Sequence, residues 1–171
     1  MSKIDIKKIG ITNLSTDAVV NAANEWLRQG SGVCGYIFAG AGADMMTKAC
    51  NEYGHCNPGS AVITPGFNLP ARFVIHAVGP IWHGGYNEEE STLYSAYTSS
   101  LKLCIDNDLH SIGFPLISSG IYGYPLKPAW EVAIRACRDF IRIHNDYCID
   151  ITIAVLDDRI MKIGNEILVS D

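Results

Sequence analysis

Short apolar runs alternate with longer segments of helical periodicity along most of this chain. The short runs have the length of strands, and the longer segments repeat apolar residues at the spacing of a helix. Strands are expected at residues 4–9, 18–21, 61–64, 73–78, 111–116 and 148–156. Helices are expected at residues 36–53, 88–107, 129–144 and 158–168, with Pro128 suited to an early helix position.

The order of these elements predicts the fold class. Strands that alternate with helices form a largely parallel, twisted sheet with helices on both faces. A chain of 171 residues fits one domain, and neither a repeat nor a linker divides it, so residues 1–171 are expected to form a single domain. Gly40 and Gly42 are expected to weaken the first turns of the helix at residues 36–53.

Composition and charge exclude several classes of protein. The chain is 48% hydrophobic and 18% charged, which is typical of a compact fold rather than of disorder. Its formal net charge is −5, and no basic run exceeds Lys7-Lys8, so binding to a nucleic-acid backbone is not expected. No stretch approaches membrane-spanning length, and the start of the chain lacks an apolar signal region. We expect a cytoplasmic monomer that does not contact a membrane.

The cysteines raise the question of a metal site or of disulfide bonds. No Cys-x-x-Cys pair or His–Cys cluster has the spacing of zinc ligands. Cys104 and Cys137 fall in apolar helical patterns, where a free thiol packs as a small hydrophobe. The sequence therefore predicts free thiols in a reducing compartment, no metal and no cofactor. The six cysteines are Cys34, Cys50, Cys56, Cys104, Cys137 and Cys148.

Two glycine-containing loops, far apart in the sequence, each follow an expected strand and precede an expected helix. Glycine lets the backbone approach a ligand closely, and free N–H groups at a helix start favour an anion. Two such loops at strand ends predict one crevice that holds a diphosphate from both sides. The loops read Asn21-Ala22-Ala23-Asn24 followed by Gly30-Ser31-Gly32-Val33-Cys34-Gly35, and Ser118-Ser119-Gly120-Ile121-Tyr122-Gly123.

The order of these motifs resembles that of the macrodomain family, whose members bind ADP-ribose and often hydrolyse its conjugates. The resemblance covers residues 9–158 and includes the segments at residues 17–24, 68–76 and 115–125. Each motif is weak by itself, but their combination in this order is specific. The resemblance implies a three-layer α/β/α macrodomain with a mixed, mostly parallel central sheet.

The resemblance also implies a role for each part of the crevice. Ile11 would lie beside the adenine, the loop amides would bind the diphosphate, and Asn24 and Tyr122 would contact the distal ribose. Asn24 and Cys34 are the candidate catalytic residues. The residues implied to bind ADP-ribose are Ile11, Asn24, Gly30, Ser31, Gly32, Val33, Cys34, Gly35, Ser118, Ser119, Gly120, Ile121 and Tyr122.

Three positions depart from the family pattern. Gly10 stands where members commonly have an aspartate that accepts from the adenine amino group. Its absence removes a hydrogen bond worth roughly 1.5–3 kcal/mol. Cys34 and Phe38 stand where hydrolytic members usually have aspartate and histidine. A thiol is a weaker hydrogen-bonding group than a carboxylate, and a phenyl ring cannot transfer a proton.

Several of these residues also have structural interpretations. Asn21 and Asn24 can satisfy backbone groups at a strand end, and Asn21 is the better candidate for that role. His76, inside an apolar strand, is expected to be a hydrogen-bonded core histidine. Cys34 at a helix start can act as a nucleophile with His83 as its base, but the favoured interpretation is a small neutral residue that lines the loop.

We therefore expect the crevice to bind ADP-ribose or a close derivative. We also expect hydrolysis of an ADP-ribosyl conjugate, either an ADP-ribosylated protein or O-acetyl-ADP-ribose. Without a carboxylate at position 34, a water held by loop amides or the substrate phosphate oxygens would assist the attack, while Asn24 positions the ribose. The alternative is a non-catalytic reader of ADP-ribose or a related nucleotide, which the departures at Cys34 and Phe38 favour.

Overall fold

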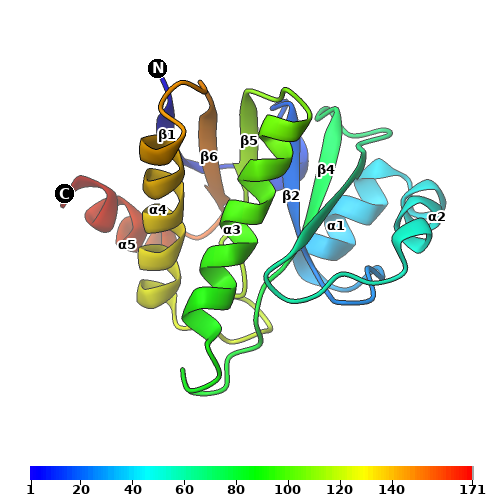
Figure 1. The fold of residues 1–171 in the computed structure, drawn as a ribbon. Helices are drawn as coiled ribbons and strands as arrows, with labels where there is room; N and C mark the ends of the chain where they lie inside the picture. The colour runs from blue at the N-terminus through cyan, green and yellow to red at the C-terminus, as the bar shows by residue number, and fades with distance from the viewer. Residues whose placement is uncertain (171) are drawn as a thin grey trace.

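The computed structural model describes residues 1–170, which form a six-stranded sheet with helices around it (Figure 1). The strands are β1 (Lys3–Lys8), β2 (Ala18–Ala23), β3 (Ala61–Pro65), β4 (Phe73–Val78), β5 (Ser111–Phe114) and β6 (Asp150–Val155). The helices are α1 (Gly32–Ala41), α2 (Ala43–Tyr53), α3 (Glu89–Asp106), α4 (Leu126–Ile143) and α5 (Asp158–Val169). A short 3-10 helix, η1 (Ile11–Asn13), follows β1.

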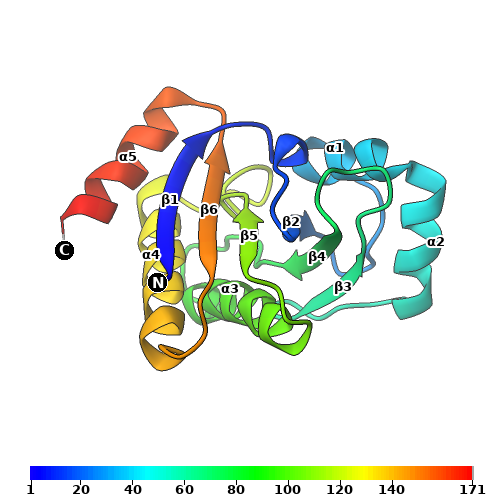
Figure 2. The ribbon, with the colours of Figure 1, turned by 90° about the horizontal axis from the view of Figure 1, so that it is seen from above.

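The strands lie in the order β1-β6-β5-β2-β4-β3 (Figure 2). Every neighbouring pair is parallel except β3 and β4, which are antiparallel. This exception is possible because β3 lies at the sheet edge and is joined to β4 by a loop, with no crossover helix. The expected mixed, mostly parallel sheet is confirmed.

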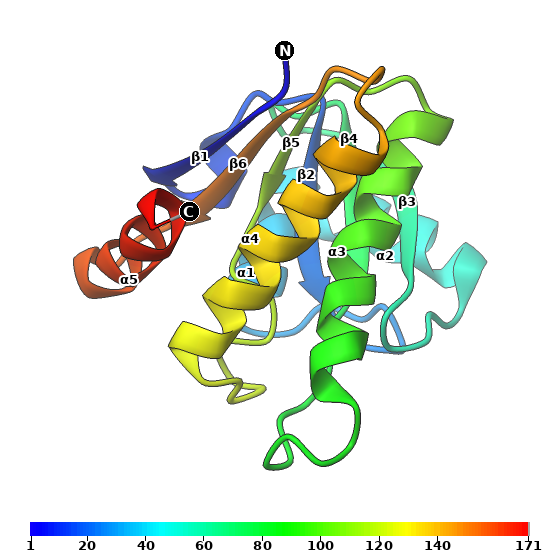
Figure 3. The same cartoon turned by 60° about the vertical axis from the view of Figure 1, so that its left-hand side comes forward.

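Helices cover both faces of the sheet. α3 and α4 lie side by side on one face, α1 and α2 cover the other, and α5 lies beside β1 (Figures 1 and 3). Consecutive residues of β2 belong to opposite cores: Val19 lies in the cluster that contains Phe38 of α1, and Val20 in the one that contains Trp130 of α4. Successive strand side chains point to opposite faces, so a strand buried on both faces needs a continuous apolar run. The three-layer α/β/α arrangement is confirmed.

The helix expected at residues 36–53 is in fact two helices. α1 begins earlier, at Gly32, and the chain turns at Gly42, whose φ is 107°. The Gly42 N–H still donates to the Phe38 carbonyl, but this left-handed backbone, which glycine adopts without strain, ends the helix. α2 then starts at Ala43. The expectation of one helix with weak first turns was wrong, because Gly42 is its break. β4 has the expected bounds, and the other expected elements are present with shifted ends.

Within residues 1–170, no helix is both long enough and apolar enough to cross a membrane. The cysteines are unpaired in the described structure, and all are buried except Cys148. Cys104 in α3 and Cys137 in α4 are fully buried, which confirms their packing as small apolar residues.

Candidate functional site

The two glycine loops begin at neighbouring strands. β2 and β5 pair directly, and the first loop follows β2 while the second follows β5, at the lower edge of the sheet in Figure 1. From β2 the chain continues to β3 and β4 on one side, and from β5 it continues to β6 on the other. This is a topological switch point, the place where open α/β sheets bind ligands beyond the carboxyl ends of their strands.

Asn24 and close backbone packing hold the first loop. Asn24 Nδ2 donates to the Arg28 carbonyl at 2.8 Å, and Asn24 Oδ1 accepts from the Arg28 N–H at 3.1 Å. Gly35 is required because a Cβ there would lie 2.6 Å from the Gly30 carbonyl oxygen. None of these contacts uses the N–H groups of residues 30–34, which have no acceptor within the described chain. These residues span the N-cap and first turn of α1, where unbound N–H groups attract anions.

The second loop is held mainly by its serines. Ser118 Oγ donates to the Pro80 carbonyl and Ser119 Oγ to the Leu116 carbonyl, each at 2.7 Å. The backbone bonds of the loop use the N–H groups of residues 119, 123 and 124. Among residues 1–170, nothing accepts from the N–H groups of residues 120–122. Two runs of unbound amides therefore follow adjacent strands.

Tyr122 is the aromatic residue of the second loop. Burial raises the pKa of its phenol, and the negative charge of Glu25 raises it further. Its carbonyl also accepts from the Trp82 N–H at 2.9 Å, which ties the second loop to the segment after β4. Glu25 directly follows Asn24, and its Oε1 lies 3.9 Å from His55 Nε2. Sequence reasoning missed this residue, although its position next to Asn24 was the available signal.

A second carboxylate missed from the sequence, Glu89, organises the segment before α3. Its side chain is 1% exposed, and it accepts from the N–H groups of His83, Gly85 and Asn87 at 2.6–3.0 Å. Desolvation alone would raise the pKa of this carboxyl, but the backbone N–H groups outweigh it and lower the pKa to about 2. Trp82 directly precedes this segment, and its N–H donates to the Tyr122 carbonyl. Glu89 therefore stabilises the segment that contacts the second loop.

Replacing Glu89 with glutamine should destabilise the fold in a pH-dependent way. The folded pKa of about 2 lies below the usual 4.5, so the carboxylate stabilises the fold fully above pH 4.5 and loses that effect as the pH falls toward 2. The gap in urea midpoint between wild type and E89Q should be constant near neutrality and shrink below pH 4.5. Glu52→Gln, on the exposed surface of α2, is the control. A gap that does not change with pH would contradict this role.

Comparison with known proteins decides the family. A family model described as Macro domain matches residues 20–133. The chain belongs to the Macro domain family. It is 46% identical over 147 residues to a protein of Escherichia fergusonii named O-acetyl-ADP-ribose deacetylase, covering 84% of this chain and 82% of that one. It is 45% identical over 145 residues to the ADP-ribose glycohydrolase MACROD2 of Xenopus laevis, covering 84% of this chain and 34% of that one. A solved structure of the Trypanosoma brucei macrodomain in complex with ADP-ribose is 35% identical, with a TM-score of 0.88 over 95% of this chain and 68% of that one.

This macrodomain uses Cys34 as a buried contact residue. Cys34 is 6% exposed, and its thiol donates to the Arg28 carbonyl at 3.4 Å and accepts from Asn21 Nδ2 at 3.5 Å. His83, considered from the sequence as a base for the thiol, is not a partner in either contact. The thiol therefore ties the first loop to β2.

A buried polar chain runs beneath the crevice of the macrodomain. Asn21 Nδ2 lies 3.0 Å from His76 Nδ1, and His76 Nε2 lies 3.0 Å from Thr64 Oγ1 and 3.7 Å from Cys50 Sγ. Burial lowers the pKa of His76 to about 4, so the ring is neutral at physiological pH. The expected hydrogen-bonded core histidine is confirmed. Phe38, fully buried in α1, meets this ring edge-on at 6.3 Å between centroids.

The two asparagines have the opposite contacts from those favoured on the sequence. Asn21 was the better candidate for backbone bonding, but its amide contacts the side chains of His76 and Cys34. Asn24 makes the backbone bonds, both to Arg28. The reason is direction: Asn21 lies within β2 and points into a core, whereas Asn24 follows the strand end.

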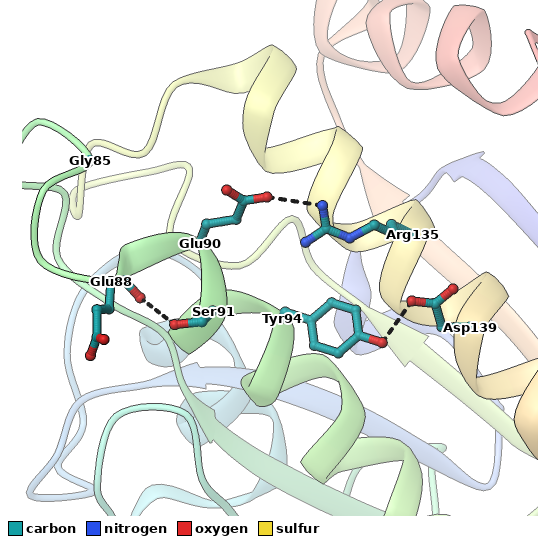
Figure 4. A pocket seen from close by; sticks show the side chains of 7 residues that line it. All are labelled: Gly85, Glu88, Glu90, Ser91, Tyr94, Arg135 and Asp139. Carbon is teal, nitrogen blue, oxygen red and sulfur yellow. Dashed lines mark hydrogen bonds and ion pairs between the residues drawn. The ribbon is translucent and has the colours of Figure 1, made fainter.

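A separate hollow of about 580 Å³ lies between α3 and α4 (Figure 4). Its polar groups are paired across the two helices: Arg135 with Glu90 at 2.9 Å, and Tyr94 with Asp139 at 2.7 Å. None of the residues that line the hollow belongs to either glycine loop. No group of three or more metal-binding side chains occurs in the described part of the chain.

Proposed function

We propose that this macrodomain binds ADP-ribose and hydrolyses an ADP-ribosyl conjugate, either O-acetyl-ADP-ribose or an ADP-ribosylated protein. The observation that carries the proposal is the pair of unbound amide runs, at residues 30–34 and 120–122, after adjacent strands. Backbone N–H groups of this kind bind a diphosphate without basic side chains, which suits a chain of net charge −5. The names of the relatives support the same ligand and the same reaction class.

In this mechanism the distal ribose lies between Asn24 and Tyr122, next to Glu25. For an acetyl ester, water attacks the acetyl carbonyl carbon, and the Glu25 carboxylate accepts the proton from that water. The tetrahedral intermediate then expels the ribose oxygen, which takes the proton back from Glu25, so acetate and ADP-ribose are released. Asn24 and the loop amides hold the substrate in place during both steps.

The test is incubation with O-acetyl-ADP-ribose and with a mono-ADP-ribosylated protein, following release of acetate and of ADP-ribose. Calorimetry with ADP-ribose measures binding in parallel. Release above the uncatalysed rate supports the hydrolase. Binding without turnover of either substrate would support the alternative, a non-catalytic reader, which the departures at Cys34 and Phe38 favour.

Two variants identify the side chain that moves the proton. Cys34→Ala should leave kcat within about threefold of wild type, because the thiol bonds to Arg28 and Asn21 rather than to a base. Glu25→Gln should lower kcat by about tenfold with little change in the Kd of ADP-ribose, a modest effect for general-base catalysis because the carboxylate is half-exposed. Steady-state kinetics would measure both. A large loss in C34A with full activity in E25Q would reverse the assignment and support a thiol-dependent hydrolase.

We also propose that the protein acts as a monomer in the cytoplasm. Its unpaired thiols fit a reducing compartment, and its net charge of −5 argues against a nucleic-acid partner. Light scattering during size-exclusion chromatography would measure the oligomeric state. Salt-sensitive binding to RNA would contradict the expected choice of partner.

A further inference from the structure

The turn after β1 carries an amide side chain at the position where this chain lacks a carboxylate. β1 is parallel to β6, which is parallel to β5, so the carboxyl end of β1 lies on the same side of the sheet as the two loops. The turn at residues 10–13 follows there and packs against α1. A Cβ built on Gly10 would lie 3.2 Å from Asn13 Nδ2 and 4.0 Å from Asn13 Cγ. The Asn13 amide thus lies directly beside the space that a side chain at position 10 would enter.

The backbone of the turn fixes Asn13, and its side chain is available to a ligand. The Asn13 N–H donates to the Gly10 carbonyl at 3.0 Å, which closes the turn. Asn13 is exposed, and its amide has no hydrogen-bond partner within residues 1–170. The N–H of Ile11, next to Gly10, likewise has no acceptor in this part of the chain. A donor and an amide therefore lie together at this end of the crevice.

Resting on the proposed function, we infer that Asn13 replaces the carboxylate at position 10 and reads the 6-position of the nucleobase. The Asn13 Oδ1 accepts from the 6-amino group of adenine, while the Ile11 N–H donates to a ring nitrogen. A carboxylate only accepts hydrogen bonds, but an amide both accepts and donates. Asn13 therefore tolerates a 6-oxo purine better than aspartate would, and the site selects adenine less strictly.

The experiment measures Kd by calorimetry for ADP-ribose and for inosine diphosphate ribose, which carries a 6-oxo group in place of the 6-amino group. The preference for adenine is the ratio of the two Kd values. Asn13→Asp should raise that ratio by about fivefold to tenfold over wild type, because the carboxylate binds the amino group more strongly and repels the oxo group. Asn13→Ala should weaken ADP-ribose binding by about threefold to tenfold.

Asn145→Asp is the matched control, because it makes the same change on an exposed asparagine between α4 and β6. This segment lies at the amino ends of the parallel strands, away from the loops at their carboxyl ends. The ratio of Kd values cancels a general effect of added negative charge on the diphosphate. A ratio in N13D equal to that of wild type, or N13A binding ADP-ribose as tightly as wild type, would overturn the inference while leaving the proposed function intact. Binding of neither ligand by the wild type would overturn both.

Discussion

Replacing Gly120 with valine should abolish measurable ADP-ribose binding without unfolding the protein. A Cβ at Gly120 has no atom within 4 Å, and the backbone there is outside the left-handed region, so valine costs the fold little. The added side chain would stand at the start of the unbound amides at residues 120–122 and keep the diphosphate away from them. We expect the Kd to rise about a hundredfold or more, which corresponds to a loss of ~2.8 kcal/mol in binding free energy.

Calorimetry with ADP-ribose measures this loss, and thermal unfolding of the same variant shows whether the fold is kept. Asn165→Val, on an exposed position of α5, controls for the added β-branched side chain. Gly32→Val is a less clean test, because Gly32 has a φ of 61° and a side chain there strains the backbone. If G120V binds ADP-ribose within about threefold of wild type, the diphosphate does not lie at the second loop.

Replacing Asn24 with alanine should lower kcat by about a hundredfold. The Asn24 side chain makes two hydrogen bonds to the backbone of Arg28, and in the proposed complex it also orients the distal ribose. Without it the turn loosens and the scissile bond loses its position, and a misplacement of about 1 Å can cost that much in rate. Binding of ADP-ribose should fall less than tenfold, because the amide runs hold the diphosphate.

Steady-state kinetics on O-acetyl-ADP-ribose and calorimetry on ADP-ribose separate the two effects for Asn24→Ala. Asn165→Ala, on α5, is the matched control. Turnover by N24A at the wild-type rate would remove Asn24 from the mechanism. A loss of affinity with kcat unchanged would instead assign it to uniform binding of the ligand.

Most of the fold could be predicted because its signals are local. The apolar runs at residues 18–21 and 73–78 became β2 and β4, which are neighbours buried on both faces. Pro128 lies in the first turn of α4, as expected. The break at Gly42 was missed because a glycine in the sequence shows only that a helix is less stable there. Whether that glycine adopts a positive φ and ends the helix depends on how the chain must turn in the fold.

The candidate site could be predicted only in outline. The motifs correctly placed each loop between a strand and a helix, but that β2 and β5 are neighbours came from the structure. The roles of the loops in binding ADP-ribose remain predictions. Glu89 was missed because an acidic residue at a helix start usually faces solvent, and only the fold of residues 83–87 turns three N–H groups toward it.

By itself, the sequence determined most of the strand and helix order, the largely parallel sheet, and two glycine loops able to present backbone amides to an anion. These follow from periodicity and from the conformations of single residues. The tertiary structure alone decided that Cys34 bonds to Asn21 and Arg28, that His76 pairs with Asn21 and Thr64, and that the Asn13 amide lies beside Gly10. Such contacts depend on directions of approach between segments, and His76 lies in a strand far along the chain from Asn21, so no local pattern encodes them.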